Sequence, residues 1–180
     1  MSRKERTRFA LGNALTELIS ERGFDSITVQ DVLDRAGVGR STFYVHYDGK
    51  EDLLASDVDR FWSYFADALA DESSDRVVPV RELLEHVSDT RDFQRGLRAS
   101  GRYAQVFEAG RVHIARAIEQ RLARSPRARH VRRADLQPIA LMHAAALLAM
   151  VEWWLEGAPA MSAAEADALF HRNFWKSLDP

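Results

Sequence analysis

The sequence predicts an all-α protein, and three observations carry this prediction. Apolar residues recur at helical spacing along almost all of the 180 residues, and no segment alternates polar and apolar residues as a strand does. Capping residues, glycines and prolines stand where helices would begin and end. The composition, 46% hydrophobic and 29% charged, is that of a globular chain long enough to bury a sizeable core. The periodicity predicts about nine helices.

The first helix carries an apolar stripe, and Gly23 stands in the position that ends it. The stripe consists of Leu11, Ala14, Leu15, Leu18 and Ile19. A short helix begins after Thr28, a residue type that favours the N-cap, and ends at Gly37.

A second short helix is predicted from about Gly39 to Tyr47. Asp48, followed three residues later by Glu51, resembles a capping box and predicts the start of a longer helix. The apolar residues on the inner side of that helix are Leu54, Val58, Phe61, Trp62, Phe65 and Leu69.

Five more helices are predicted in the remaining two thirds. Acidic and polar residues at 71–76 predict a loop, followed by short helices at Val80–Val87 and Asp92–Ser100, the second weakened by Gly96 and Gly101. A long helix is marked by Tyr103, Phe107, Ile114, Ile118 and Leu122 and ends at Ser125-Pro126. Another runs from Asp135 to Glu156, and Ser162 with Glu165 predicts a capping box for the last helix, which bears Ala166, Leu169, Phe170, Phe174 and Leu178.

The strongest functional signal lies in residues 27–54. Two short helices joined by a tight turn at Ala36-Gly37-Val38 are typical of a helix-turn-helix motif. In the second helix, Phe43 can point inward while polar residues occupy the outer face and the N-terminal end, where free N–H groups favour a phosphate. These polar residues are Arg40, Ser41, Thr42 and Tyr44. The arrangement suits insertion of this helix into the major groove of DNA.

The residues of this segment resemble the N-terminal domain of the TetR (tetracycline-repressor-like) family over roughly residues 5–60. The matching residues are Gly23-Phe24, Thr28-Val29, Asp31-Val32, Ala36-Gly37-Val38, Thr42-Phe43-Tyr44, His46-Tyr47 and Lys50 to Leu54. The resemblance implies an all-helical homodimer whose residues 1–48 form the DNA-binding domain. It implies that residues 49–180 form a helical domain for effector binding and dimerisation.

The resemblance also implies roles for individual residues. Phosphate contacts would come from Thr28, Thr42, Tyr47 and Lys50. Arg40, Ser41 and Tyr44 would face the groove, and Arg40 is the best candidate to read a guanine edge. His46 has either a phosphate contact or a packing role. Gly39 and Leu33 depart from the family, which commonly has Ser and Ala there; the first change removes a side-chain cap and the second alters helix packing.

The charge is unevenly distributed. The whole chain carries −2, and residues 1–50 carry +1, so DNA affinity would depend on a few placed contacts and on dimerisation. Residues 95–133 contain eleven Arg against two acidic residues, which leaves −11 on the rest of the chain. This Arg-rich segment is either a second surface for nucleic acid or an anionic ligand, or a set of solvated helix faces and a basic loop balanced by acidic segments; we favour the second interpretation.

The predicted helix from Asp135 to Glu156 is apolar on nearly every face, so each face must be buried against another part of the protein or a partner. Its most apolar run, Ile139 to Val151, is too short to span a membrane. The helix is therefore either the centre of a monomer or, as we favour, half of a four-helix dimer interface with the last helix. The interface residues would be Leu147, Met150, Val151, Trp154, Phe170 and Phe174.

Aromatic residues predict a pocket for a small hydrophobic or aromatic effector between the helices. Its candidate lining is Trp62, Phe65, Leu69, Phe93, Tyr103, Phe107 and His143. Each of these residues, taken alone, is more often part of an ordinary core than of a binding site.

Several classes of protein are excluded or disfavoured. The chain has no cysteine, hence no disulfide or thiol nucleophile, and no cluster of spaced His and carboxylates predicts a metal or other cofactor. Gly96 and Gly101 have the spacing of a phosphate loop, but Arg102-Tyr103 follow in place of Lys-Ser/Thr, and no catalytic motif occurs. No apolar signal core follows the basic N-terminus, which favours the cytoplasm.

We therefore expect a ligand-responsive, sequence-specific DNA-binding regulator and no enzyme. Its expected action is repression, with a small molecule releasing it from a near-palindromic operator. The alternative is a helical small-molecule-binding or protein-interaction module that keeps the helix-turn-helix as a scaffold.

Overall fold

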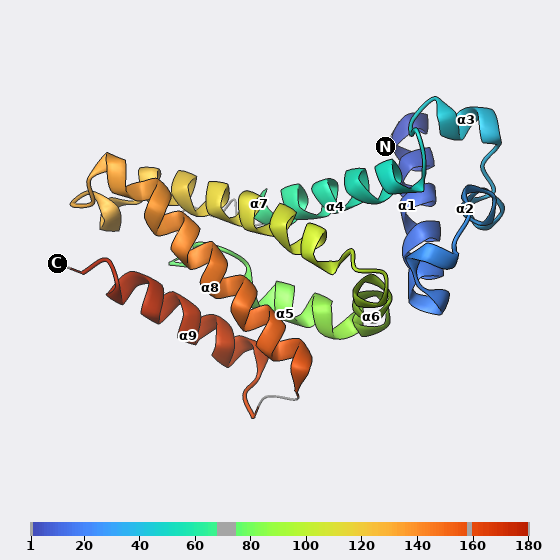
Figure 1. Ribbon diagram of the computed structural model, residues 1–180. Coiled ribbons are helices and arrows are strands. Elements are labelled where there is room, and N and C mark those ends of the chain that lie inside the picture. Colours follow the sequence, from blue (N-terminus) through green and yellow to red (C-terminus); the bar gives the residue numbers. More distant parts are fainter. Residues whose placement is uncertain (1, 68–74, 158–159, 180) are drawn as a thin grey trace. The chain divides into compact units, whose positions relative to one another are not determined.

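The computed structural model describes residues 2–67, 75–157 and 160–179, and within these it contains nine α-helices, three 3-10 turns and no strand (Figure 1). The prediction of an all-α fold is confirmed. The helices are α1 (Arg3–Arg22), α2 (Val29–Ala36), α3 (Arg40–Tyr44), α4 (Lys50–Asp67), α5 (Val80–Asp89), α6 (Arg91–Ala99), α7 (Tyr103–Arg124), α8 (Leu136–Glu156) and α9 (Ala163–Lys176). They form two compact units, Met1–Arg60 with Thr90–Val106, and Phe61–Asp89 with Phe107–Pro180.

The first unit is built on the predicted stripe of α1. All five stripe residues are buried and meet Phe24, Phe43 and Leu53 in one core. Gly23 ends α1 with φ 76°, and Gly37 ends α2 in the left-handed region with φ 64°. Both conformations are ones that glycine adopts without steric cost, so each glycine marks a true helix end.

Two details of the first unit differ from the sequence prediction. The helix predicted to reach Tyr47 is only α3, since the chain leaves the helix after Tyr44. The predicted capping box of Asp48 and Glu51 is wrong, because the carboxylate that accepts from the Asp48 backbone N–H is that of Asp52, at 3.1 Å. Helix α4 accordingly begins at Lys50.

Helix α6 belongs to the first unit although it is distant in sequence, and it packs across α1. Gly96 permits this packing, because a Cβ at that position would lie 2.3 Å from the carbonyl oxygen of Ile19. The glycine that weakens the helix by propensity is thus required by its packing. The division of function at residues 48 and 49 stays a prediction.

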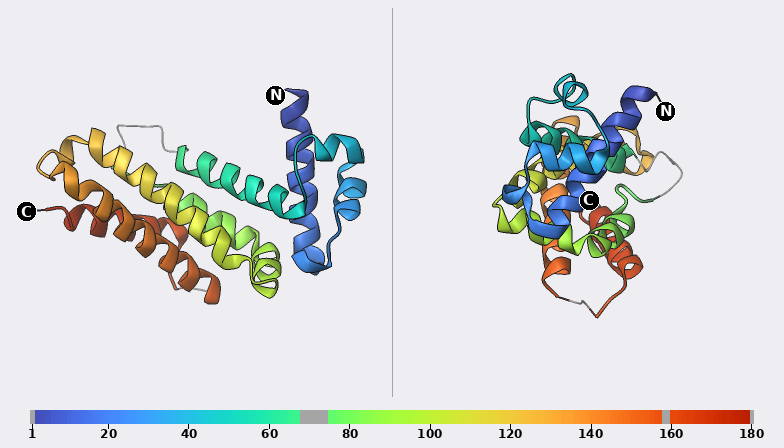
Figure 2. Two further views of the ribbon diagram at one scale, coloured as in Figure 1. Left: turned by 45° about the horizontal axis from the view of Figure 1, so that its top comes forward. Right: turned by 90° about the vertical axis from the view of Figure 1, so that its right-hand side faces the viewer.

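In the second unit α5 packs against α8 and α9, and Figure 2 shows the same helices from two other directions. The predicted capping box of α9 is confirmed: the Glu165 backbone N–H donates to Ser162 Oγ at 3.3 Å, and the Ser162 N–H donates to the Glu165 carboxylate at 2.7 Å. Gly110 of α7 lets Trp62 lie against the helix backbone, since a Cβ there would come within 2.6 Å of the indole ring.

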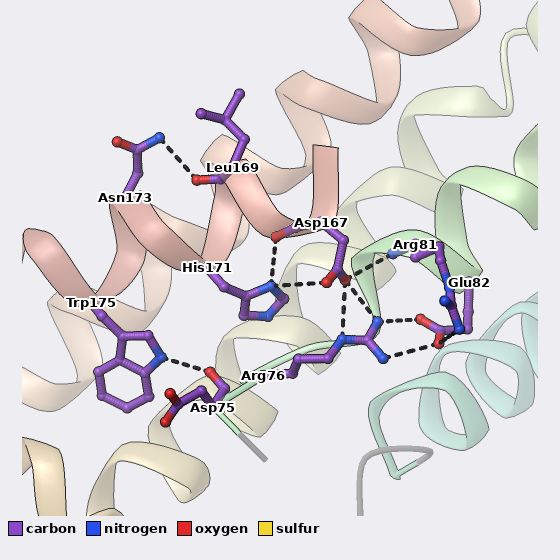
Figure 3. Close-up of polar contacts among 9 residues, drawn as sticks. All are labelled: Asp75, Arg76, Arg81, Glu82, Asp167, Leu169, His171, Asn173 and Trp175. Atoms are coloured by element: carbon purple, nitrogen blue, oxygen red, sulfur yellow. Dashed lines mark hydrogen bonds and ion pairs between the residues drawn. The ribbon is translucent and has the colours of Figure 1, made fainter. Parts of the chain in front are cut away.

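Polar groups also join α5 and α9 in this unit (Figure 3). Arg76 donates to Asp167 Oδ1 at 2.7 Å and pairs with the carboxylate of Glu82 at 2.5 Å. His171 is buried and its Nδ1 lies 2.8 Å from the carbonyl oxygen of Asp167. Arg76, through side-chain hydrogen bonding, lowers the pKa of Glu82 to about 2. One arginine therefore links the segment before α5 to the first turn of α5 and to Asp167 of α9.

Within the described part of the chain, one face of helix α8 is buried and the opposite face is exposed. Its buried residues include Ala140, Ala144 and Leu147, whereas Met142 is 62% exposed and Trp153 is 49% exposed. By length and composition the helical stretch Arg133–Glu156 could cross a membrane, since an 18-residue window within it has a mean hydropathy of 1.5. The run Ile139 to Val151, taken from the sequence alone, is shorter than this helical stretch. Core helices of soluble proteins pass the same test, and α8 packs its buried face against α5.

Candidate nucleic-acid interface

Helix α2 is held at its first turn by a reciprocal capping box. The Asp31 backbone N–H donates to Thr28 Oγ1 at 3.2 Å, and the Thr28 N–H donates to Asp31 Oδ2 at 2.7 Å. Hydrogen bonds from Thr28 and then from Arg22 lower the pKa of Asp31 to about 2. The Thr28 hydroxyl also donates to this carboxylate at 2.7 Å, so it is engaged within the chain, and its phosphate contact stays a prediction.

The turn between α2 and α3 fixes the direction of α3. Gly37 reverses the chain, and the Val38 N–H donates to the Leu33 carbonyl at 3.1 Å. Phe43 is fully buried and anchors α3, with its ring 5.7 Å from that of Tyr47. The polar residues that were predicted to face DNA, Arg40, Ser41, Thr42 and Tyr44, are all exposed. The geometry therefore leaves this face of α3 open to an external partner.

A side-chain contact crosses the turn and involves a residue that the sequence reasoning missed. Arg40 Nη2 donates to Gln30 Oε1 at 3.2 Å, and Gln30 Nε2 donates to Asp34 Oδ1 at 2.8 Å. The i,i+4 spacing of Gln30 and Asp34 on a predicted helix was the available signal. Its connection to Arg40 could not be read from spacing, because it depends on the angle between α2 and α3.

Lys50 is held inside the first unit by groups of its own chain. Its Nζ donates to the carbonyls of Phe24 at 3.0 Å and Ile27 at 2.6 Å, and it lies 4.5 Å from the centre of the Phe24 ring. These contacts fix the start of α4 against the chain between α1 and α2. The phosphate contact of Lys50 remains a prediction. It would have to use the third N–H donor of the ammonium group, since the two carbonyls take the other two.

Tyr47 is likewise a packing residue, with only 3% of its surface exposed. Its hydroxyl accepts a hydrogen bond from Arg8 Nε at 3.2 Å, and Arg8 Nη2 donates to Ser56 Oγ at 3.1 Å. His46 is half-buried, with its ring 6.2 Å from that of Tyr47. The structure thus gives both residues a place in packing, while their phosphate contacts are untested.

The residues of the predicted effector pocket are divided between the two units. Trp62 and Phe65 are buried in the second unit, which also contains Phe107 and His143, while Leu69 lies outside the described residues. Phe93 and Tyr103 pack against the core of the first unit. Aromatic periodicity identified apolar helix faces, but it could not show which core each face joins. That these residues line one effector pocket stays a prediction.

Most residues predicted for the dimer interface lie in the core of their own chain. Leu147, Val151, Trp154, Phe170 and Phe174 are at most 7% exposed, and Met150 is half-buried. Trp154 Nε1 also donates to Ser88 Oγ at 2.8 Å, within the unit. The opposite face of α8 is exposed, its apolar residues being Leu141, Met142, Ala145, Ala146, Ala149 and Trp153, with Glu152 exposed beside them. Because α8 is apolar all round, its sequence could not show which face the chain itself covers.

The Arg-rich segment at 95–133 forms many contacts within the chain. Arg127 pairs with Asp75 at 3.1 Å and lies 4.3 Å from the centre of the Trp175 indole, and Arg132 binds the Asp135 carboxylate at 2.6 Å. Arg111 pairs with Glu108. These contacts support the interpretation of solvated, locally paired helix faces. Within the described parts of the chain, no group of three or more His, Cys, Asp or Glu residues could hold a metal ion.

Comparison with known proteins identifies relatives of the N-terminal helices. Residues 13–56 match the family of bacterial regulatory proteins described as the tetR family. IcaR, the negative transcriptional regulator of the biofilm operon icaADBC of Staphylococcus epidermidis, is 36% identical over 59 residues, which are 33% of this chain and 31% of IcaR. The HTH-type transcriptional regulator YxbF of Bacillus subtilis strain 168 is 33% identical over 78 residues, 43% of this chain and 20% of YxbF. The match thus covers no more than a third of these relatives.

Solved structures share the fold over nearly the whole chain. DhaS, a dihydroxyacetone kinase operon activator, superposes with a TM-score of 0.69 at 16% identity and covers 96% of both chains. A transcriptional regulator from Streptococcus agalactiae 2603V superposes with a TM-score of 0.61 at 22% identity, over 98% of this chain and 96% of the other. At these identities the likeness establishes the arrangement of helices and nothing about ligands.

Proposed function

We propose that the chain is a sequence-specific DNA-binding transcriptional regulator of the TetR family, because residues 13–56 match that family of bacterial regulatory proteins. The observation that carries the proposal is the exposed polar face of α3, held by the buried Phe43 within a helix-turn-helix. A helix presented in this way can enter the major groove and read base edges. The proposal assigns no catalytic reaction.

The proposed action is repression by a cytoplasmic homodimer at a near-palindromic operator. IcaR is named as a negative regulator, which favours repression, whereas DhaS is named as an activator. The homodimer is supported by the exposed apolar face of α8, defined above by six residues from Leu141 to Trp153. Two α3 helices related by two-fold symmetry would read half-sites about 34–36 Å apart.

The proposed effector is a small hydrophobic or aromatic molecule that binds within the second unit. The proposal is supported by a cluster of aromatic rings on α4 and α5, formed by Trp62, Phe65 and the stacked pair of Phe61 and His86, whose ring centres are 4.8 Å apart. Thermal-shift screening of such compounds, followed by measurement of DNA release, tests this part of the proposal. A compound that stabilises the protein without changing its DNA affinity is not its effector.

The central test is selection of DNA by the protein from a pool of random duplexes. We expect the wild type to enrich one near-palindromic sequence. We expect Arg40→Ala to reduce the preference for this duplex over a scrambled one by roughly tenfold or more, the size of one good base contact. Arg116→Ala, which removes an exposed arginine from α7, is the matched control and should keep the preference. A wild type that enriches no sequence would favour the module that keeps the motif only as a scaffold.

A further inference from the structure

We propose that Gln30 is a positioning residue that sets the base preference of Arg40, and that Asp34 fixes the direction of the Gln30 amide. The inference rests on the proposed function of α3 as the DNA-reading helix. It assigns a role in specificity to two residues of α2, the helix on the other side of the turn.

The three side chains form a connected row across the helix-turn-helix. Gln30 is the second residue of α2, Asp34 lies one turn further on, and Arg40 is the first residue of α3. The two bonds of the row are the 3.2 Å bond from Arg40 to Gln30 Oε1 and the 2.8 Å bond from Gln30 Nε2 to Asp34 Oδ1. All three residues are exposed, so the row can be approached from outside the protein.

The chemistry of its two neighbours allows only one orientation of the Gln30 amide. An ionised carboxylate only accepts hydrogen bonds and a guanidinium only donates them. The amide between them must therefore turn its NH₂ group to Asp34 and its oxygen to Arg40. Without Asp34 the amide could rotate and present its NH₂ group to the guanidinium, where two donors would face each other. Asp34 thus controls whether Gln30 can hold Arg40.

A held guanidinium differs from a free one in how it reads a base. Guanine is recognised through two parallel hydrogen bonds to O6 and N7, which require one orientation of the guanidinium plane. The bond to Gln30 uses one of the five N–H donors of Arg40 and restricts this plane before DNA arrives. Restricting the reader in advance raises the affinity for the base that fits it and lowers tolerance of others.

Gln30 restrains Arg40 without neutralising it. Arg35, also on α2, instead lies 2.8 Å from Glu21 and 3.1 Å from Glu17, so its charge is compensated within the chain. The neutral amide leaves the full positive charge of Arg40 available to the electronegative edge of guanine. This contrast within one helix explains why an amide, and not a carboxylate, suits the position beside the reader.

The test measures affinities for the duplex that the wild type selects, for its single-base variants and for a scrambled duplex. We expect Gln30→Leu to reduce the preference for the selected base at one position per half-site by about tenfold, as for loss of one hydrogen bond to a charged group. Affinity for the scrambled duplex should stay within about twofold, since no phosphate contact is removed. Asp34→Asn, which keeps the side-chain volume, should lower the preference at the same position. Gln120→Leu on α7 is the matched control and should change nothing.

A double-mutant cycle separates positioning from direct contact. If Gln30 acts through Arg40, adding Gln30→Leu to Arg40→Ala should have no further effect. Equal losses in both backgrounds, or an unchanged preference in Gln30→Leu and Asp34→Asn, would overturn the inference while the wild type still selects its operator. Failure of the wild type to select any sequence would overturn the proposed function as well. Melting curves of all variants show whether each one is folded.

Discussion

In the first unit, two cationic side chains stabilise the fold by packing on one aromatic ring, that of Phe24. Phe24 is fully buried, and its ring lies 4.5 Å from the ammonium of Lys50 and 4.2 Å from the guanidinium of Arg102. Arg102 also lies 3.7 Å from the carboxylate of Glu51. Two cations on one aromatic ring therefore connect the chain after α1 with the beginnings of α4 and α7.

We predict that Lys50→Met lowers the free energy of unfolding by about 2 kcal/mol, because it removes two hydrogen bonds to backbone carbonyls and one cation–π contact. It should also weaken binding to selected and scrambled duplexes alike. Urea denaturation and DNA titration measure the two effects, and Lys176→Met, at an exposed position of α9, is the control. A loss of DNA binding with unchanged stability would show that the role of Lys50 lies in phosphate contact alone.

His171 gives the second unit a predictable response to acid. Burial lowers its pKa from the ordinary value of 6.5, in spite of the nearby Asp167. The unfolded chain therefore binds this proton more readily than the folded chain, and stability falls as the pH drops below about 6.5. We expect His171→Gln to reduce the loss of stability between about pH 7.5 and 5.5, measured by urea denaturation. An unchanged pH slope in the variant would contradict this assignment.

At the scale of elements, the close packing of α6 on α1 requires a glycine at position 96. Gly96→Ala would gain up to about 1 kcal/mol in helix propensity, but the new methyl group would meet the Ile19 carbonyl, a backbone group with little freedom to move. We predict a net loss of about 1–3 kcal/mol, as for other overpacked sites.

Thermal or urea denaturation measures this loss. Gly157→Ala is the control, since a Cβ there meets no atom within 4 Å. A stabilised Gly96→Ala protein would mean that α6 can move away from α1 without cost.

The helices and their ends were predicted best from the sequence, and the reason is physical. Helix ends depend on local groups, so the N-caps Thr28 and Ser162 and the end at Gly37 were visible in the sequence and are confirmed. The exposure of the α3 face followed from spacing around Phe43. The sequence could not show which core the apolar faces of Phe93 and of α8 join, because this depends on contacts between helices that are distant in sequence.

At the scale of the whole molecule, the exposed apolar face of α8 determines the proposed assembly. Small residues at Ala145, Ala146 and Ala149 would allow a second α8 to approach closely, while Met142 and Trp153 supply apolar area. A face of this kind on a surface helix marks an interaction site.

We predict that Ala149→Arg converts the protein from a dimer to a monomer and abolishes tight operator binding, because a long charged side chain would replace a small residue where the two helices approach closely. Light scattering and DNA titration test this. Ala123→Arg, at an exposed position of α7, should remain dimeric. A dimeric Ala149→Arg protein would place the interface on another face.

The first unit also determines when a newly made chain can acquire its DNA-reading end. Residues 1–60 are synthesised early, but α6 and the start of α7, which complete the unit, follow only at residues 90–106. Until then Leu97 is missing from the core that also contains Ile19, and the apolar stripe of α1 is not yet packed by α6. The helix-turn-helix therefore reaches its final stability only after the ribosome has passed well into the second unit, so a nascent chain stalled after α4 would remain incompletely folded.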